Sequence, residues 1–232
     1  DAAAMMGPMR LIDVSHVVTD GMTTYPGLPG PRITDHLTWE ASHATYAPGT
    51  EFRIGRIEMV ANTGTYLDTP AHRHRDGWDL ADLPLQKVAM VPLTLVDAAG
   101  PAIDATAFDG HELAGRAVVV RTGWSRHWGT EAYGAGGHPH LTSGAGPAAY
   151  ARALVDAGAR LVGIDSINID GTATGERPAH TILLGAGIPI VEHLCNLDAV
   201  PDAPGATFTA VPVKAAGTAT FPVRAFVAVP GD

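Results

Sequence analysis

Short apolar runs, separated by clusters of glycine and proline, form the hydrophobic pattern of this chain, and each run predicts a β-strand. Ala117–Arg121 and Leu161–Asp165 are continuously apolar, which is typical of strands that are buried on both faces. The other predicted strands are Arg10–Val18, Arg53–Ala61, Val88–Val96, Ile188–Glu192, Thr207–Val213 and Phe221–Val229. The last two have the pattern of an antiparallel pair. Pro92 cannot donate a ladder hydrogen bond, so we expect its strand at a sheet edge or at a bulge.

Helical periodicity appears in two places among these strands. Tyr150, Leu154 and Ala157 recur at helical spacing, and Gly158 supplies a stop signal. A second, shorter helix is predicted in Ala179–Gly187. A strand, a helix and a strand in succession imply a parallel crossover unit. We therefore predict one α/β domain with a mixed sheet.

Composition narrows the class of protein. The 232 residues are 46% hydrophobic and 17% charged, enough apolar side chain for a substantial core, and the formal net charge of −9 argues against a nucleic-acid partner. No apolar run approaches the roughly eighteen residues needed to span a bilayer. The single cysteine, Cys195, cannot form an internal disulfide, so we expect the protein in a reducing cytoplasm. Its apolar sequence context favours a role as a small buried hydrophobic residue over a role as a nucleophile. Asp1–Pro8 resembles an expression remnant, so the domain is expected to span residues 9–232.

The stretch Asn62–His74, N-T-G-T-Y-L-D-T-P-A-H-R-H, is the first candidate site. It contains a carboxylate, two imidazoles, a phenol and a carboxamide, next to an apolar run. In extended backbone Asn62, Tyr66 and Asp68 would point to one face. Burying such a row of polar groups is costly without a role for it.

Carboxylate and imidazole groups elsewhere could complete a metal site with this stretch. Asp68 and Glu192 end strand regions, and His180 lies on the intervening helix. Such groups suit Zn²⁺ or Mn²⁺, and the candidates are Asp68, His72, His74, His180 and Glu192. A nearby histidine outside the ligand shell could move protons. Eleven histidines also produce clusters by chance, so spacing alone does not decide. His74, between two arginines, is expected on a solvated face. The chain has neither a nucleophile elbow nor a phosphate-binding glycine loop.

These residues resemble the cyclase and kynurenine-formamidase-like metal hydrolases, which include arylformamidases and isatin hydrolases. The family signature is H-[ST]-G-T-H-x-D-x-P-x-H, and this chain has N-T-G-T-Y-L-D-T-P-A-H at 62–72. L-I-D-V-S-H, G-I-D-S-I-N-I-D, H-T-I-L-L and I-V-E-H-L-C-N-L resemble further blocks, so the resemblance covers nearly the whole chain.

The resemblance implies a swivelling β/β/α-type fold, a homo-oligomer, metal ligands at Asp68, His180 and Glu192, and a catalytic acid/base at His72. Two ligand histidines of the family fall on Asn62 and Tyr66, which are poor ligands because a carboxamide is neutral and a phenol keeps its proton. One divalent metal is therefore expected rather than two, and a metal-free protein is the alternative.

Three functions remain open on this basis. The first is hydrolysis of an amide, lactam or lactone in a small aromatic substrate by metal-activated water, with Tyr66 or Asn62 steadying the oxyanion. The second is a metal-poor cyclase or isomerase of a polyketide-type pathway that uses His72 and Tyr66. The third is a catalytically silent relative that only binds a ligand. The candidates for an aromatic substrate pocket are Tyr25, Trp78 and Trp124, with Trp128 and Tyr133.

Overall fold

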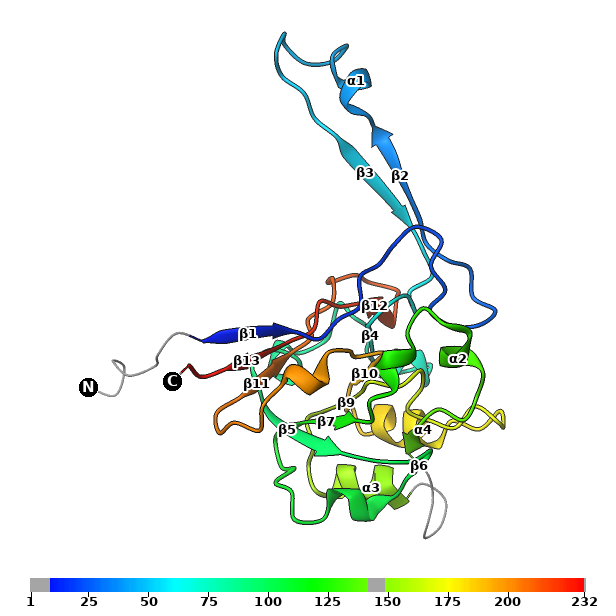
Figure 1. The fold of residues 1–232 in the computed structure, drawn as a ribbon, viewed down its shortest axis with the longest axis vertical. Coiled ribbons are helices and arrows are strands. Elements are labelled where there is room, and N and C mark those ends of the chain that lie inside the picture. The colour runs from blue at the N-terminus through cyan, green and yellow to red at the C-terminus, as the bar shows by residue number, and fades with distance from the viewer. Residues whose placement is uncertain (1–8, 142–148, 232) are drawn as a thin grey trace, which may run out of the picture.

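The computed structural model describes residues 9–141 and 149–231, so the predicted remnant Asp1–Pro8 lies outside it. The main sheet contains β1 Arg10–Asp13, β4 Tyr66–Asp68, β5 Val91–Asp97, β7 Ala117–Arg121, β9 Leu161–Ile164, β10 Ile190–Glu192, β11 Thr207–Thr209, β12 Thr220–Pro222 and β13 Phe226–Val229. Their order across the sheet is β1-β13-β11-β5-β7-β9-β10-β4-β12 (Figure 1). β5, β7, β9 and β10 are parallel, and the remaining pairings are antiparallel. The predicted α/β fold with a mixed sheet is confirmed.

The α-helices are α1 Trp39–Ser42, α2 Glu131–Gly134, α3 Ala149–Asp156 and α4 Pro178–Gly185. Two further strand pairs lie outside the main sheet: β2 Arg32–Leu37 with β3 Ile54–Glu58, and β6 Ala102–Ile103 with β8 His140–Leu141. Short 3-10 turns complete the structure: η1 Pro70–His72, η2 Leu85–Lys87, η3 Ala105–Phe108, η4 Trp124–His127 and η5 Leu197–Ala199. The predicted helices correspond to α3 and α4, and Gly158 has the positive φ expected after α3.

Two hydrophobic cores cover the two faces of the sheet, which explains the continuously apolar strands. Along β7, Val118 and Val120 belong to the core that includes α3 and α4, whereas Ala117 and Val119 belong to the opposite core. Because successive side chains of a strand point to opposite faces, a strand between two cores must be apolar at every position. α3 joins β7 to the parallel strand β9, so the predicted crossover is confirmed.

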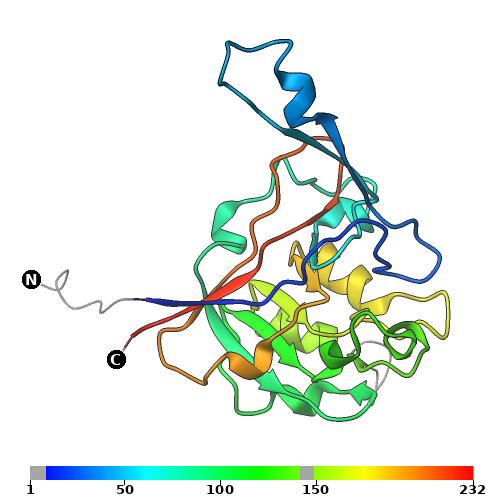
Figure 2. The ribbon, with the colours of Figure 1, turned by 45° about the horizontal axis from the view of Figure 1, so that its top comes forward.

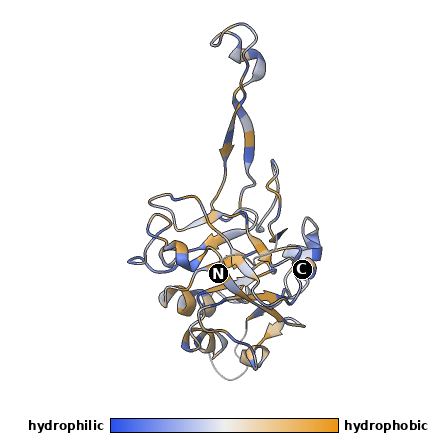
Figure 3. Ribbon diagram, turned by 90° about the vertical axis from the view of Figure 1, so that its left-hand side faces the viewer, coloured by the Kyte–Doolittle hydropathy of each residue, from blue (hydrophilic) through white to orange (hydrophobic). Residues whose placement is uncertain are grey.

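A two-stranded arm projects from the body of the protein (Figures 1 and 2). It consists of β2, α1 and β3, and every residue of β3 is exposed. Hydrophobic residues concentrate in the main sheet and also occur along the arm (Figure 3). The predicted strand Arg53–Ala61 is therefore a strand only over Ile54–Glu58, and it pairs with β2 in the arm rather than in the main sheet.

Three other details of the predicted strands need correction. β5 lies between β11 and β7, so Pro92 is not in an edge strand. The Leu93 N–H donates on the β11 side, to the Ala206 carbonyl, so the nitrogen of the preceding Pro92 faces the β7 side. Proline is tolerated there because the pairing of β5 with β7 begins only at Leu93. The predicted strand Phe221–Val229 is two strands, β12 and β13, of which only β13 pairs with β11. β1 also ends at Asp13, earlier than predicted.

Within the described residues, no helix is both long enough and apolar enough to cross a bilayer.

Candidate active site

The pairing of β4 with β10 brings distant polar residues together on one face of the sheet. Asp68 lies opposite Ile190 and Tyr66 opposite Glu192. Directly opposed residues share a face, and Ile190 packs in the core that contains α4. The side chains of Tyr66, Asp68 and Glu192 therefore point towards α4, as the alternation from Tyr66 to Asp68 predicts.

His180, on α4, meets both carboxylates. Its Nε2 lies 3.7 Å from Asp68 Oδ2 and 3.6 Å from Glu192 Oε1. On the other side of the ring, Nδ1 lies 2.6 Å from Asp170 Oδ2. Asp170 also accepts hydrogen bonds from the N–H groups of Ala179 and His180, so it fixes the start of α4 as well as the imidazole.

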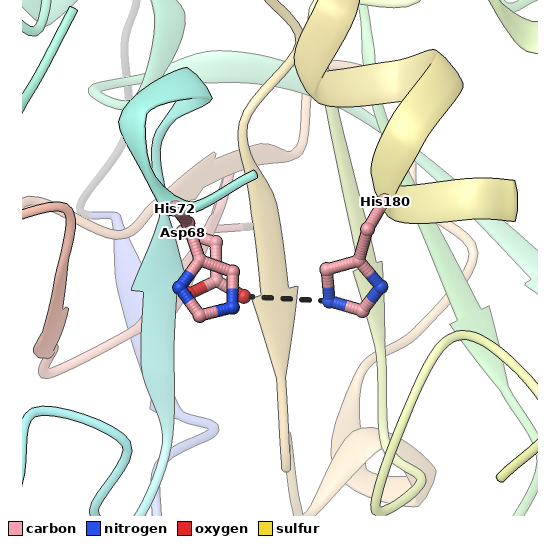
Figure 4. A group of neighbouring side chains, drawn as sticks. All are labelled: Asp68, His72 and His180. Carbon is pink, nitrogen blue, oxygen red and sulfur yellow. Dashed lines mark ion pairs between the residues drawn. The ribbon is translucent and has the colours of Figure 1, made fainter. Parts of the chain in front are cut away.

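His72 approaches the same carboxylate from η1 (Figure 4). Its Nδ1 lies 3.7 Å from Asp68 Oδ1 and 3.0 Å from Thr220 Oγ1. The Thr220 hydroxyl donates to Asp68 Oδ1 at 2.5 Å. The His72 side chain is 34% exposed, whereas Asp68 is completely buried. His72 is therefore the part of the cluster that can exchange protons with solvent.

Tyr66 and the backbone hold Glu192 in place. The Tyr66 hydroxyl donates to Glu192 Oε2 at 2.7 Å, and Ile169 N–H donates to Oε1 at 2.6 Å. Burial and the charge of Glu192 raise the pKa of Tyr66 well above its usual value, so this hydroxyl keeps its proton. Burial also raises the pKa of Glu192 to about 7.

The charges around His180 favour a cation at the centre of the cluster. Burial disfavours the charged imidazole, but the surrounding carboxylates outweigh it and raise the pKa of His180 to about 10. Burial alone would raise the pKa of Asp68, but the neighbouring histidines and Thr220 hold it below its usual value. A metal ion between these carboxylates would take the place of the proton on Nε2, because an imidazole ligand must be neutral.

The donor atoms fit a divalent metal. Single ligand atoms of Asp68, His72 and His180 lie within 4.8 Å of one another. Asp68 Oδ2 is buried and has no hydrogen-bond partner among the described residues, which is costly unless another group binds it. Glu192 Oε1 lies next to His180 Nε2 and is a further oxygen ligand. The structure thus brings together the three predicted ligands and His72.

A cavity of about 370 Å³ opens onto this cluster. Of the predicted site residues, Tyr25, Asn62, Tyr66, His72, His180 and Glu192 line it. Trp78 lines a separate surface cavity next to His74, and the Trp124 indole donates to the Tyr133 carbonyl. Trp128 and Tyr133 line a third cavity. The positions of Trp78 and Trp124 therefore do not support the predicted contact with the substrate.

Sequence reasoning missed four residues of the site. Asp170 and Thr220 position His180 and Asp68, while Asn168 and Arg177 line the cavity. Asp170 and Asn168 stand in the polar loop after β9, a place where site residues gather, but Thr220 carries no such signal. His74 also differs from its prediction, because it is partly buried and its Nε2 bonds the Thr181 carbonyl.

Comparison with known proteins identifies the family of this chain. Residues 12–171 match the protein-family model named Cyclase. The chain belongs to the cyclase family. It is 29% identical over 218 residues to a kynurenine formamidase of Bacillus cereus, covering 93% of this chain and 96% of that protein. A kynurenine formamidase of Salinibacter ruber is also 29% identical, over 224 residues, with 94% and 96% covered.

Solved structures agree with this cyclase-family fold. Isatin hydrolase A from Labrenzia aggregata, bound to benzyl benzoate, aligns with a TM-score of 0.80 at 21% identity, over 96% of this chain and 94% of that chain. A potential metal-dependent hydrolase with cyclase activity aligns with a TM-score of 0.72 at 25% identity, over 97% and 100%. The predicted family and the expectation of a hydrolase-type enzyme are confirmed.

Proposed function

We propose that this cyclase-family protein hydrolyses the C–N bond of a small aromatic amide, such as an aryl formamide or a lactam. The observation that carries the proposal is the convergence of Asp68, Glu192 and His180 on one point, with His72 beside it at a cavity. Relatives named kynurenine formamidase and the isatin hydrolase fold support this reaction class. The cavity volume of about 370 Å³ suits a ligand with one or two rings.

We propose a single divalent ion, Zn²⁺ or Mn²⁺, held by Asp68 and His180 with Glu192. When bound, such an ion polarises the substrate carbonyl and lowers the pKa of water. Asn62 and Tyr66 do not add strong ligands, which argues against a second ion. The unpaired oxygen of Asp68 and the crowding of carboxylates around one imidazole support the assignment.

His72 is proposed as the proton-transfer residue. Its ring reaches the cavity and is partly exposed, and Thr220 and Asp68 orient its Nδ1. During hydrolysis it would accept a proton from the attacking water and return one to the leaving amine. For Tyr66 we propose support of Glu192 in place of the expected contact with the oxyanion, because its only hydroxyl proton is donated to Glu192. Asn62, whose carboxamide lines the cavity, remains the candidate for binding the oxyanion.

Metal analysis and turnover of formanilide test this function together. Protein purified without chelator should contain about one equivalent of metal, and chelation should remove activity that the ion restores. His72→Ala should lower kcat about 10²–10⁴-fold, the usual contribution of an acid/base group, and keep the metal content. Loss of the metal in this variant would make His72 a ligand instead. Metal-free protein that still turns over an unsaturated carbonyl substrate would favour the cyclase or isomerase alternative.

A further inference from the structure

Arg177 lies at the wall of the catalytic cavity, one turn before His180. It is the residue before Pro178, the first residue of α4, and it lines the same cavity as His72 and Glu192. It is half-buried. No sequence motif singles it out, and none of the contacts that build the metal cluster involves it.

The guanidinium of Arg177 is held by its own loop. Nη1 donates to the carbonyls of Thr174 at 2.8 Å and Glu176 at 2.7 Å. Nε and Nη2 make no hydrogen bond with the described part of the chain, and no described carboxylate forms an ion pair with Arg177. One edge of a planar cation is thus anchored, and the other is free to bind a ligand.

This cation is unusual among the groups that line the cavity. The other lining residues are neutral, are histidines, or are the carboxylate Glu192. Arg177 is therefore the only permanent positive charge there among the described residues. An unpaired guanidinium favours an anion, and its fork matches the two oxygens of a carboxylate. Because the loop already fixes the side chain, less entropy is lost when a ligand binds.

We infer that Arg177 is a specificity residue that anchors a carboxylate of the substrate, so the preferred substrates are aromatic amides that carry an anionic group. The inference rests on the proposed function, since it specifies the substrate class of that same cavity. The aromatic ring would lie between Arg177 and the catalytic cluster, near Tyr25 and Leu28, which also line the cavity. Neutral aryl amides would still be cleaved, with weaker binding.

Binding of two simple amines tests this inference without any turnover. By calorimetry at low ionic strength, the metal-loaded protein should bind 2-aminobenzoate at least tenfold more tightly than aniline. Arg177→Gln should remove this preference, and Arg177→Lys should keep part of it because the charge remains. Arg126→Gln is the matched control, because Arg126 also bonds a carbonyl of its own turn but does not line the cavity. An unchanged preference in Arg177→Gln would overturn the inference, since the carboxylate would then bind elsewhere, for instance at the metal.

Kinetics separate the inference from the proposed function. In Arg177→Gln, the ratio of KM for 2-formamidobenzoate to KM for formanilide should rise at least tenfold over the wild-type ratio. An equal loss for both substrates would show a structural role and would reject the inference. Failure of the wild-type protein to cleave either substrate would reject the proposed function, and the binding preference would still decide the role of Arg177.

Discussion

Tyr66 and Glu192 face each other across the β4–β10 pairing, and the Tyr66 hydroxyl donates a 2.7 Å hydrogen bond to Glu192 Oε2. In the family signature the position of Tyr66 belongs to a histidine ligand. The phenol here donates to a neighbouring carboxylate, and burial and the charge of Glu192 raise its pKa well above the usual value. The tyrosine at this position of the signature thus supports Glu192, which we propose as a ligand.

Restoring the imidazoles at these positions should strengthen metal binding. We expect Asn62→His with Tyr66→His to tighten binding of Zn²⁺ at least tenfold, measured by competition with a chromogenic chelator, because the variant adds two strong nitrogen ligands. Tyr66→Phe is the matched control, since it releases Glu192 without adding an imidazole. Equal affinities in the wild type and the double variant would show that the Asn62 and Tyr66 positions do not reach the ion.

Asp170 is expected to tune the metal site through His180. Asp170→Asn should weaken metal binding about 10–100-fold, the usual effect of losing the carboxylate behind a histidine ligand. Because Asp170 also accepts two N–H groups at the start of α4, the melting temperature should fall as well. Asp165→Asn is the control: it changes a buried carboxylate that binds Thr122 and Gly123 instead. If both variants bind metal equally well, Asp170 has only a structural role.

Two buried histidines should make the fold sensitive to acid. Burial lowers the pKa of His193 to about 3 and that of His16 to about 4. Below the usual histidine pKa of about 6.5 the unfolded chain binds protons that the folded protein does not, so stability falls as the pH decreases towards 3. Through a completely buried histidine such as His193, the protein loses about 1.4 kcal/mol of unfolding free energy for each unit by which the pH falls in this window.

Chemical denaturation at several pH values measures this effect. His193→Gln should flatten the dependence of the unfolding free energy on pH, whereas His36→Gln, at an exposed position of the arm, should leave it unchanged. The raised pKa of Glu192 has the opposite effect, because it increases the stability as the pH falls from about 7 to 4.5. The effect of His193 is therefore the difference between the unfolding free energies of the wild type and the variant at each pH. Parallel curves for the wild type and His193→Gln would contradict the assignment.

The arm should take part in self-association. An isolated two-stranded hairpin is marginal in water, yet this one exposes Trp39, Phe52, Ile54 and Ile57, at 49%, 49%, 46% and 60%. We propose that a second copy of the chain covers them, which accounts for the homo-oligomer expected from the family resemblance. Light scattering should show a dimer or larger species, and Ile54→Thr with Ile57→Thr should shift it towards monomer. Val213→Thr, an exposed residue of the body, is the control; a monomeric wild type would reject the proposal.

Local patterns in the sequence were sufficient for much of this protein. Continuous apolar runs predicted the buried strands β7 and β9, helical spacing predicted α3, and the signature from Asn62 to His72 indicated both the family and the position of the site. Each of these signals comes from residues close together in the chain, where backbone periodicity and turn chemistry act directly.

Only the tertiary structure decided which distant residues meet. The β4–β10 register sets Tyr66 against Glu192, and the loop after β9 brings Asp170 behind His180 and Arg177 into the cavity. The same holds for the aromatic residues, since Tyr25 reaches the cavity while Trp78 and Trp124 do not. Strand pairing and loop packing join segments that are far apart in the chain, as between Thr220 and Asp68 at a separation of 152 residues. Residue spacing in the sequence does not reveal such contacts.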